Sequence, residues 1–202
     1  MRRVTERHRP GFWIGAAGAI VALLSAGVTP GFAQQSVAVR AILAKGALPT
    51  EDPNAAIWNT APQASFPMSP QVHWQNRIQE VTVKDVKVRA LHDGNQVAFL
   101  VEYADPTEDA DDAAALEFMV GDKKAHFAHG QPMMQVEGGP VNIWFWKNKD
   151  KKGVDMNAMG FGTLKVQSHQ DVKATGAYSS GTWKIVFSRP LATEHEIGRA
   201  HV

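Results

Sequence analysis

The sequence predicts an all-β protein, an antiparallel β-sandwich connected by loops or short helices. From Val81 onward, apolar and polar residues alternate in short runs rich in valine, and a period of two is typical of strands with one buried face. No long stretch repeats its apolar residues at the 3.6-residue period of a helix. Two packed sheets are the arrangement that such short alternating runs favour.

The strands are expected in the order in which these runs occur. Residues 81–88 and 97–101 flank Asp93-Gly94, and Asp-Gly tolerates the positive φ angles of a tight turn, so the pair predicts a hairpin. Further strands are expected at 115–120, 141–147, 163–167, 172–178 and 182–188. A Ser-Ser-Gly turn connects the last two.

Two charged segments between these runs are expected to be loops. Residues 104–112 are acidic and contain a proline, so they form either a solvated loop or a calcium site, although the glycine and closing glutamate of an EF-hand are missing. Residues 148–155 carry three lysines. This second segment is either a solvated face or a docking surface for an acidic partner.

The first 33 residues have the order of an export signal. A basic start is followed by an apolar stretch at 11–28 and by small residues that end at Ala33. We expect cleavage near Ala33, export to the periplasm and no stable membrane insertion afterwards. The alternative is an uncleaved membrane anchor, because the apolar stretch approaches the length that spans a bilayer. Arg2-Arg3 leaves both general secretion and twin-arginine export open.

The composition of the remaining chain limits the classes of function. After residue 33 there are 17 basic and 19 acidic residues, a formal charge of −2, which does not favour binding to nucleic acid. The chain contains no cysteine, so it can form neither disulfides nor the thioether bonds that attach a c-type haem. With 44% hydrophobic residues, residues 34–195 are expected to form one domain.

The final residues, 196–202, can be back-translated into a string that looks like a sequencing adapter. We expect them to be an artefact, and the domain to be truncated at its carboxyl end. They take no part in the predicted fold.

The candidate chemistry lies around Met134 and the aromatic run that follows it. A thioether is a soft, neutral ligand of haem iron, and aromatic residues provide apolar walls for a macrocycle. The period of two places Trp144 and Trp146 on one face of their strand. These residues therefore indicate either a haem site or a tightly packed core. His126 and His129 are three residues apart, a spacing that leaves zinc open but is equally typical of an ordinary loop.

The chain resembles the haem-b-binding gamma subunits of the ethylbenzene dehydrogenase, dimethylsulfide dehydrogenase, chlorate reductase and selenate reductase family, also described as a cytochrome c-552/DMSO reductase-like haem-binding domain. The motifs are Met134 seven residues before Val141-x-x-Trp144-x-Trp146, and matches in the same order at 52–61, 67–71, 89–94, 99–106, 160–163, 181–183 and 187–191. The residue after the methionine is Gln135, where the family has glycine.

The resemblance implies a periplasmic electron-transfer subunit that catalyses no reaction itself. Its partners would be the iron–sulfur beta subunit and the molybdenum-containing alpha subunit of one complex, and a soluble periplasmic electron carrier. Met134 would be an axial ligand of haem b iron, with Trp144, Trp146 and Phe127 nearest the ring. The family's second ligand is a lysine beyond the Arg-Pro-Leu motif, with no counterpart before residue 196, so we expect the chain without it to bind haem weakly or not at all. The alternative function is a non-catalytic carbohydrate-binding module, which shares this architecture.

Overall fold

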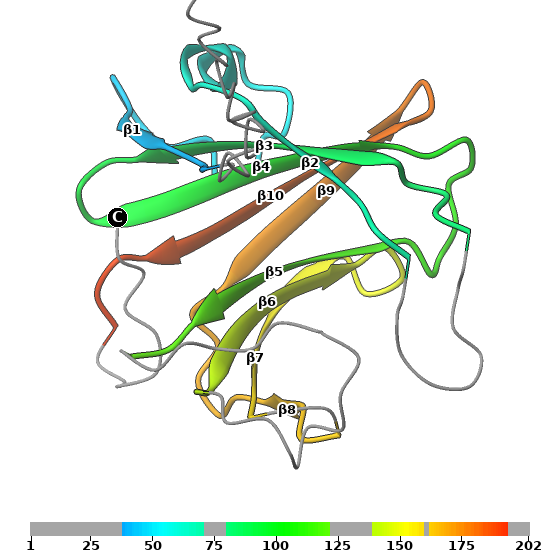
Figure 1. Cartoon of the computed structure of the whole chain (residues 1–202). Helices are drawn as coiled ribbons and strands as arrows, with labels where there is room; N and C mark the ends of the chain where they lie inside the picture. Colours follow the sequence, from blue (N-terminus) through cyan, green and yellow to red (C-terminus); the bar gives the residue numbers. More distant parts are fainter. Residues whose placement is uncertain (1–37, 71–79, 122–138, 160–161, 194–202) are drawn as a thin grey trace, which may run out of the picture. The chain divides into compact units, whose positions relative to one another are not determined.

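The protein folds into two β-sheets (Figure 1). The computed structural model describes residues 38–70, 80–121, 139–159 and 162–193. The elements in this part of the chain are β1 (Ala41–Leu43), the 3₁₀ helix η1 (Ala56–Thr60), β2 (Ala64–Pro67), β3 (Asp85–His92), β4 (Gln96–Ala104), β5 (Ala113–Met119), β6 (Val141–Lys147), β7 (Lys152–Ala158), β8 (Lys165–Val166), β9 (Lys173–Ser179) and β10 (Thr182–Pro190). The predicted all-β sandwich class is confirmed.

The larger sheet has the strand order β1-β3-β4-β10-β9, with β2 also paired to β3, and the smaller sheet has the order β5-β6-β7-β8. All pairs are antiparallel except β1 with β3. The predicted hairpin is present, because β3 and β4 are connected through Gly94, which has a φ of 92°. No helix in the described ranges is long and apolar enough to cross a membrane.

The loop prediction was wrong for half of residues 148–155. Only 148–151 form a turn, and Lys152 already begins β7. Val154, Met156 and Ala158 do alternate with glycine or polar residues, but the buried position of β7 is the polar Asp155, and the lysines give the segment the composition of a loop. Lys147–Lys152 pairing closes the β6–β7 hairpin, in which Lys151 has a φ of 50°.

The main core lies between the sheets and follows the predicted alternation. On β6, Trp144 and Trp146 point inward and are fully buried, whereas Ile143 and Phe145 are partly exposed. Opposite them, β10 contributes Trp183, Ile185 and Phe187, all buried in the same cluster. A second cluster lies on the other face of the larger sheet, where η1 places Trp58 over Leu91, Leu100 and Val186.

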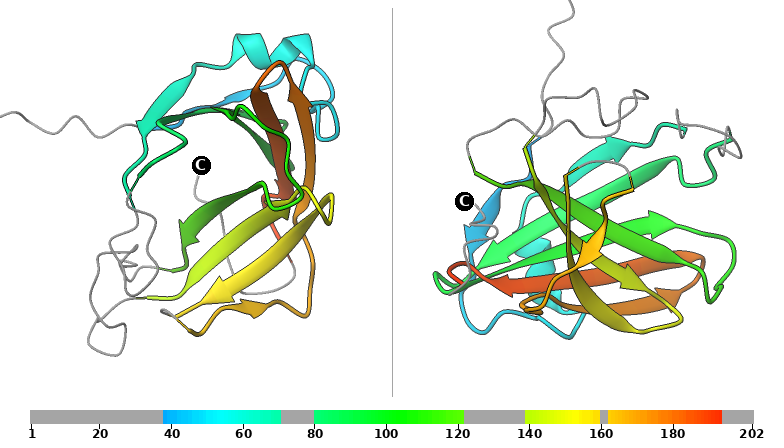
Figure 2. Two further views of the ribbon diagram at one scale, coloured as in Figure 1. Left: turned by 90° about the vertical axis from the view of Figure 1, so that its right-hand side faces the viewer. Right: turned by 90° about the horizontal axis from the view of Figure 1, so that it is seen from below.

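The two sheets approach each other closely where β7 faces β9. Small residues make this possible, because a side-chain carbon added at Gly153 would lie 2.6 Å from the backbone nitrogen of Ala174. Along the other side of the sandwich, β5 lies opposite β2, β3 and β4 (Figure 2). Residues of these four strands line a cavity. The sandwich is thus tightly packed on one side and hollow on the other.

Candidate functional site

The cavity between β5 and the larger sheet has a volume of about 880 Å³. Its lining is almost entirely apolar and comes from β2, β3, β4 and β5 with their flanking residues: Val39, Phe66, Met68, Val83, Val86, Val88, Phe99, Val101, Tyr103, Ala113, Ala114, Ala115, Leu116, Glu117 and Phe118. Cavities of this size and character are typical of sites for cofactors and other organic ligands.

The cavity exposes apolar side chains that a filled sandwich would bury. Phe99 lies on β4, which has a paired strand on both sides, yet Phe99 is partly exposed, whereas Phe187, directly opposite on β10, is fully buried. Met68 adds a thioether to the lining and is 47% exposed. Leaving such surface uncovered is costly, which favours a ligand that fills the space.

Three aromatic rings form one end of the cavity. Phe99 and Phe118 line it, and Trp144 lies against both, with ring centroids 5.7 Å from Phe99 and 4.6 Å from Phe118. Trp146 lies on the same face of β6 but packs elsewhere, with its ring 5.1 Å from Trp183. Of the two tryptophans proposed from the sequence, the structure therefore brings Trp144 next to the cavity and places Trp146 in the solid core.

The other two proposed residues, Met134 and Phe127, lie outside the described residues, between β5 and β6. The backbone on either side of this segment is described. Val120 donates a hydrogen bond from its N–H to the Pro140 carbonyl at 3.0 Å, which extends the β5–β6 pair. Phe118, two residues earlier, lines the cavity. His126 and His129 also lie outside the described residues.

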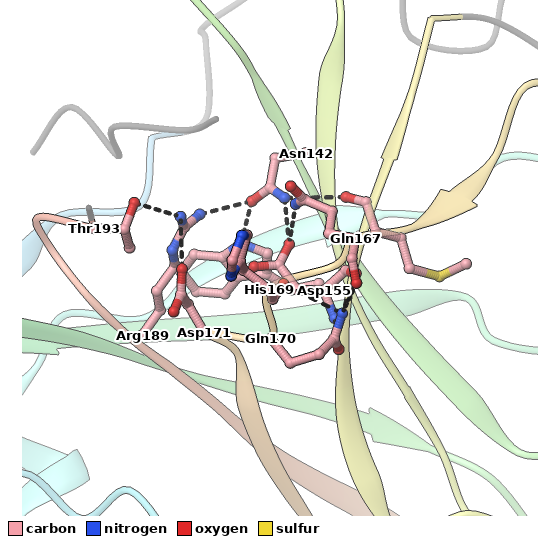
Figure 3. Close-up of polar contacts among 10 residues, drawn as sticks. Asn142, Asp155, Gln167, His169, Gln170, Asp171, Arg189 and Thr193 are labelled. Atoms are coloured by element: carbon pink, nitrogen blue, oxygen red, sulfur yellow. Dashed lines mark hydrogen bonds and ion pairs between the residues drawn. The ribbon is translucent and has the colours of Figure 1, made fainter. Parts of the chain in front are cut away.

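Behind Trp144, a buried polar network connects β6, β7 and β10 (Figure 3). Asn142 is its centre. The Asn142 Oδ1 accepts hydrogen bonds from Trp144 Nε1 at 2.6 Å and from Arg189 at 2.9 Å, and its Nδ2 donates to Asp155 Oδ1 at 2.5 Å and to the Met156 carbonyl at 3.0 Å. The Arg189 guanidinium also lies over the Trp144 ring, 5.9 Å from its centroid, a cation–π arrangement.

Sequence reasoning missed the network. Arg189 belongs to a motif used for the family resemblance, but Asn142 and Asp155 were not identified. The available signal was a polar residue at an inward position, because Asn142 shares the strand face of Trp144 and Trp146. A buried side-chain amide on the inward face of β6 requires hydrogen-bond partners. These partners come from strands that the sequence alone does not bring together.

Burial raises the pKa of Asp155 above its ordinary value of 3.8, although hydrogen bonds from Asn142 and Gln167 and the charge of Arg189 act in the opposite direction. Between pH 3.8 and the raised value, the folded state binds more protons than the unfolded state, so stability falls as the pH rises. We expect Asp155→Asn, which keeps Oδ1 as an acceptor, to gain stability relative to the wild type between pH 3.5 and pH 7. Urea unfolding of both proteins at the two pH values measures this difference in stability. A wild type that becomes more stable relative to the variant between pH 3.5 and pH 7 would contradict the prediction.

The acidic segment is bound to the sandwich and to the β6–β7 turn. Asp112 Oδ2 accepts a hydrogen bond from Trp183 Nε1 at 2.9 Å, and the Asp112 carbonyl accepts one from the Asn148 N–H at 2.8 Å. Lys147 forms an ion pair with Asp111 at 2.5 Å. Within the described ranges no group of three or more His, Cys, Asp or Glu side chains is placed to hold a metal ion.

No protein-family model matches the chain. It is 25% identical over 154 residues to a predicted respiratory nitrate reductase heme subunit, ORF7, of Haloferax mediterranei, covering 72% of this chain and 54% of that protein. It is 25% identical over 199 residues to chlorate reductase subunit gamma of Ideonella dechloratans, covering 92% of this chain and 79% of that protein. It is 27% identical over 161 residues to dimethylsulfide dehydrogenase subunit gamma of Rhodovulum sulfidophilum, covering 71% of this chain and 59% of that protein.

The chain thus spans little more than half the length of the first and third of these relatives. The first is named as a heme subunit of a reductase, and the other two as gamma subunits of a reductase and of a dehydrogenase. Their similarity confirms the resemblance inferred from the motifs: the chain is similar in sequence to a heme subunit of a reductase and to gamma subunits of a reductase and a dehydrogenase.

Proposed function

We propose that this protein binds a b-type haem in the cavity between its sheets and transfers electrons as a subunit of a molybdenum-dependent reductase or dehydrogenase complex. The observation that carries the proposal is the apolar cavity of about 880 Å³, with Trp144, Phe99 and Phe118 at one end, in a chain related to a heme subunit. Haem supplies reversible one-electron chemistry at its iron, at a potential set by the axial ligands and by burial.

The residues present fit this group. The cavity offers aliphatic and aromatic walls on both sheets, which suit the faces of a porphyrin, and the absence of cysteine leaves coordination and burial to retain it. We propose Met134 as an axial ligand through its thioether. A lysine amine would be the second ligand, as the family resemblance implies.

The partners and the location are part of the same proposal. An iron–sulfur beta subunit and a molybdenum-containing alpha subunit would exchange electrons with the haem on one side, and a soluble periplasmic carrier on the other. Export through the segment that ends near Ala33 would place the protein in the periplasm. The two gamma-subunit relatives support assembly with other subunits.

The described residues disfavour a carbohydrate-binding module. Such modules stack sugars on exposed aromatic platforms, but the four tryptophans in the described part of the chain, Trp58, Trp144, Trp146 and Trp183, are at most 2% exposed. The large apolar surface that remains accessible is the cavity wall, which is better suited to a macrocycle than to a hydroxyl-rich sugar.

Titration of the purified protein with haemin tests the function and the ligand together. Because the lysine ligand that the resemblance implies has no counterpart before residue 196, we expect weak haem binding, with a Soret band below full occupancy and reduced-minus-oxidised spectra that show the bands of a methionine-ligated haem. Met134→Ala should abolish the methionine-ligated spectrum because it removes the thioether. Met159→Ala is the matched control, since Met159 is 69% exposed and does not line the cavity, and it should leave the spectrum unchanged.

Metal-free protoporphyrin IX separates the cavity from the iron ligands, because its binding needs no axial bond. It should bind the wild type and Met134→Ala alike. Absence of porphyrin binding would contradict the haem function, whereas loss of the iron spectrum in Met68→Ala but not in Met134→Ala would move the ligand to the thioether that lines the cavity.

A further inference from the structure

The cavity changes character along its length. On β4, Phe99, Val101 and Tyr103 form an inward-facing row that runs through the lining, and four residues of strand correspond to roughly 13 Å. At the Phe99 end are the rings of Phe118 and Trp144. At the other end lies the phenol of Tyr103, beside the start of β5. One end of the cavity is therefore mainly aromatic, with the Glu117 carboxylate as the neighbour of Phe118 in the lining, and the other end contains a hydroxyl group.

The Tyr103 hydroxyl has capacity for a stronger hydrogen bond than the one it makes. Tyr103 is only 7% exposed, and its hydroxyl donates to the Ala113 carbonyl over 3.4 Å, longer than the usual O–H···O distance. Burial, reinforced by the negative charges of Asp112 and Asp105, raises the pKa of Tyr103. The phenol is therefore protonated at neutral pH and can act as a donor.

The Tyr103 end of the cavity lies beside further polar groups. Tyr103 is shared between the apolar cavity and a second, smaller cavity of about 280 Å³. The smaller cavity is lined by Thr82, Lys84, Asp85, Lys87, Glu102, Tyr103, Ala104 and Thr182. Two lysines, two carboxylates and hydroxyl groups therefore lie near the Tyr103 end, whereas aromatic rings lie at the Phe99 end.

We propose that Tyr103 donates a hydrogen bond to a porphyrin carboxylate and so orients the macrocycle, with its propionate edge toward the Tyr103 end and its apolar edge toward Phe99 and Phe118. This inference rests on the proposed haem function. A porphyrin has the same division into an apolar edge and an edge with two carboxylates. The opposite orientation would bury carboxylates against the rings of Phe99 and Phe118 and near the Glu117 carboxylate, where nothing replaces their lost hydration.

Binding of protoporphyrin IX and of its dimethyl ester, measured by fluorescence titration of wild type, Tyr103→Phe and Tyr178→Phe, tests the orientation. The ester retains the macrocycle but lacks the negative charges, so wild type should bind the free acid about tenfold more tightly, the value of one charge-assisted hydrogen bond. Tyr103→Phe should lose this preference. Tyr178→Phe is the matched control, because its hydroxyl donates to the Asp105 carbonyl at 2.9 Å and does not line the cavity; it should keep the preference.

Each other result has a defined meaning. If wild type binds acid and ester equally, or if Tyr103→Phe keeps the preference, the orientation is overturned while the haem function stands. If neither porphyrin binds to wild type, both the proposed orientation and the proposed haem function are contradicted. The wild-type comparison needs no substitution, so a folding defect in a variant cannot obscure the answer.

Discussion

Replacing Asn142 by leucine should lower the free energy of unfolding by about 4 kcal/mol, because one substitution removes the centre of the buried network. Leucine has a similar size but neither donates nor accepts. Trp144 Nε1 loses its acceptor, Asp155 loses a donor, and Arg189 loses the Asn142 oxygen at 2.9 Å. Buried groups left without hydrogen-bond partners account for most of the lost stability, since leucine fills nearly the same volume as asparagine.

Chemical denaturation of the purified protein measures this effect, and Asn54→Leu is the control. Asn54 is exposed, and its Oδ1 accepts a hydrogen bond from Lys184 at 3.2 Å, so its loss should change stability by about 0.5 kcal/mol or less. If Asn142→Leu were as mild as Asn54→Leu, the network would contribute little to the stability of the fold.

Gly176→Ala should lower the free energy of unfolding by about 3 kcal/mol, because the added methyl group overpacks the core. A Cβ at this position would lie 2.6 Å from Cη2 of Trp146 and closer still to Cζ2. The indole cannot easily move away, because Trp183 packs against it at 5.1 Å. In most strands, alanine would be preferred to glycine, so a strong destabilisation would identify the contact between β9 and Trp146 as its cause.

A double-mutant cycle with Trp146→Leu provides the control. The smaller side chain leaves space for the added methyl group, so Gly176→Ala should be nearly neutral in the Trp146→Leu background. Equal costs in both backgrounds would show that backbone conformation, rather than the indole, requires glycine at position 176. Denaturant midpoints of the four proteins are sufficient to decide.

Much of the fold was predictable from local patterns. Alternation identified the strands whose inward residues are apolar, and the same alternation correctly placed Trp144 and Trp146 on one face. The prediction failed at Lys152–Ala158, where the apolar residues of the alternation are only partly buried and the buried residue is Asp155, and it did not include the parallel pairing of Ala41–Leu43 with β3. A strand whose inward residue is polar is recognised only once its neighbours pair with it.

The candidate site was predictable only in part. Motifs indicated the family, and the relatives agree, while Met134 and Phe127 remain predictions because they lie outside the described residues. Of the remaining two residues, only Trp144 lies beside rings that line the cavity. A period of two places both tryptophans on the same face, and it contains no information about what lies opposite each of them.

By itself, the sequence determined the class of the fold, the faces of its main strands and the family that the chain resembles, because these depend on short-range periodicity and on motif spacing. The tertiary structure alone decided where the sandwich is solid and where it is hollow. Phe99 and Phe187 are paired neighbours on one sheet face, yet one lines the cavity and the other is buried. The difference arises from the distance between the sheets, which small residues such as Gly153 and Gly176 reduce on one side only.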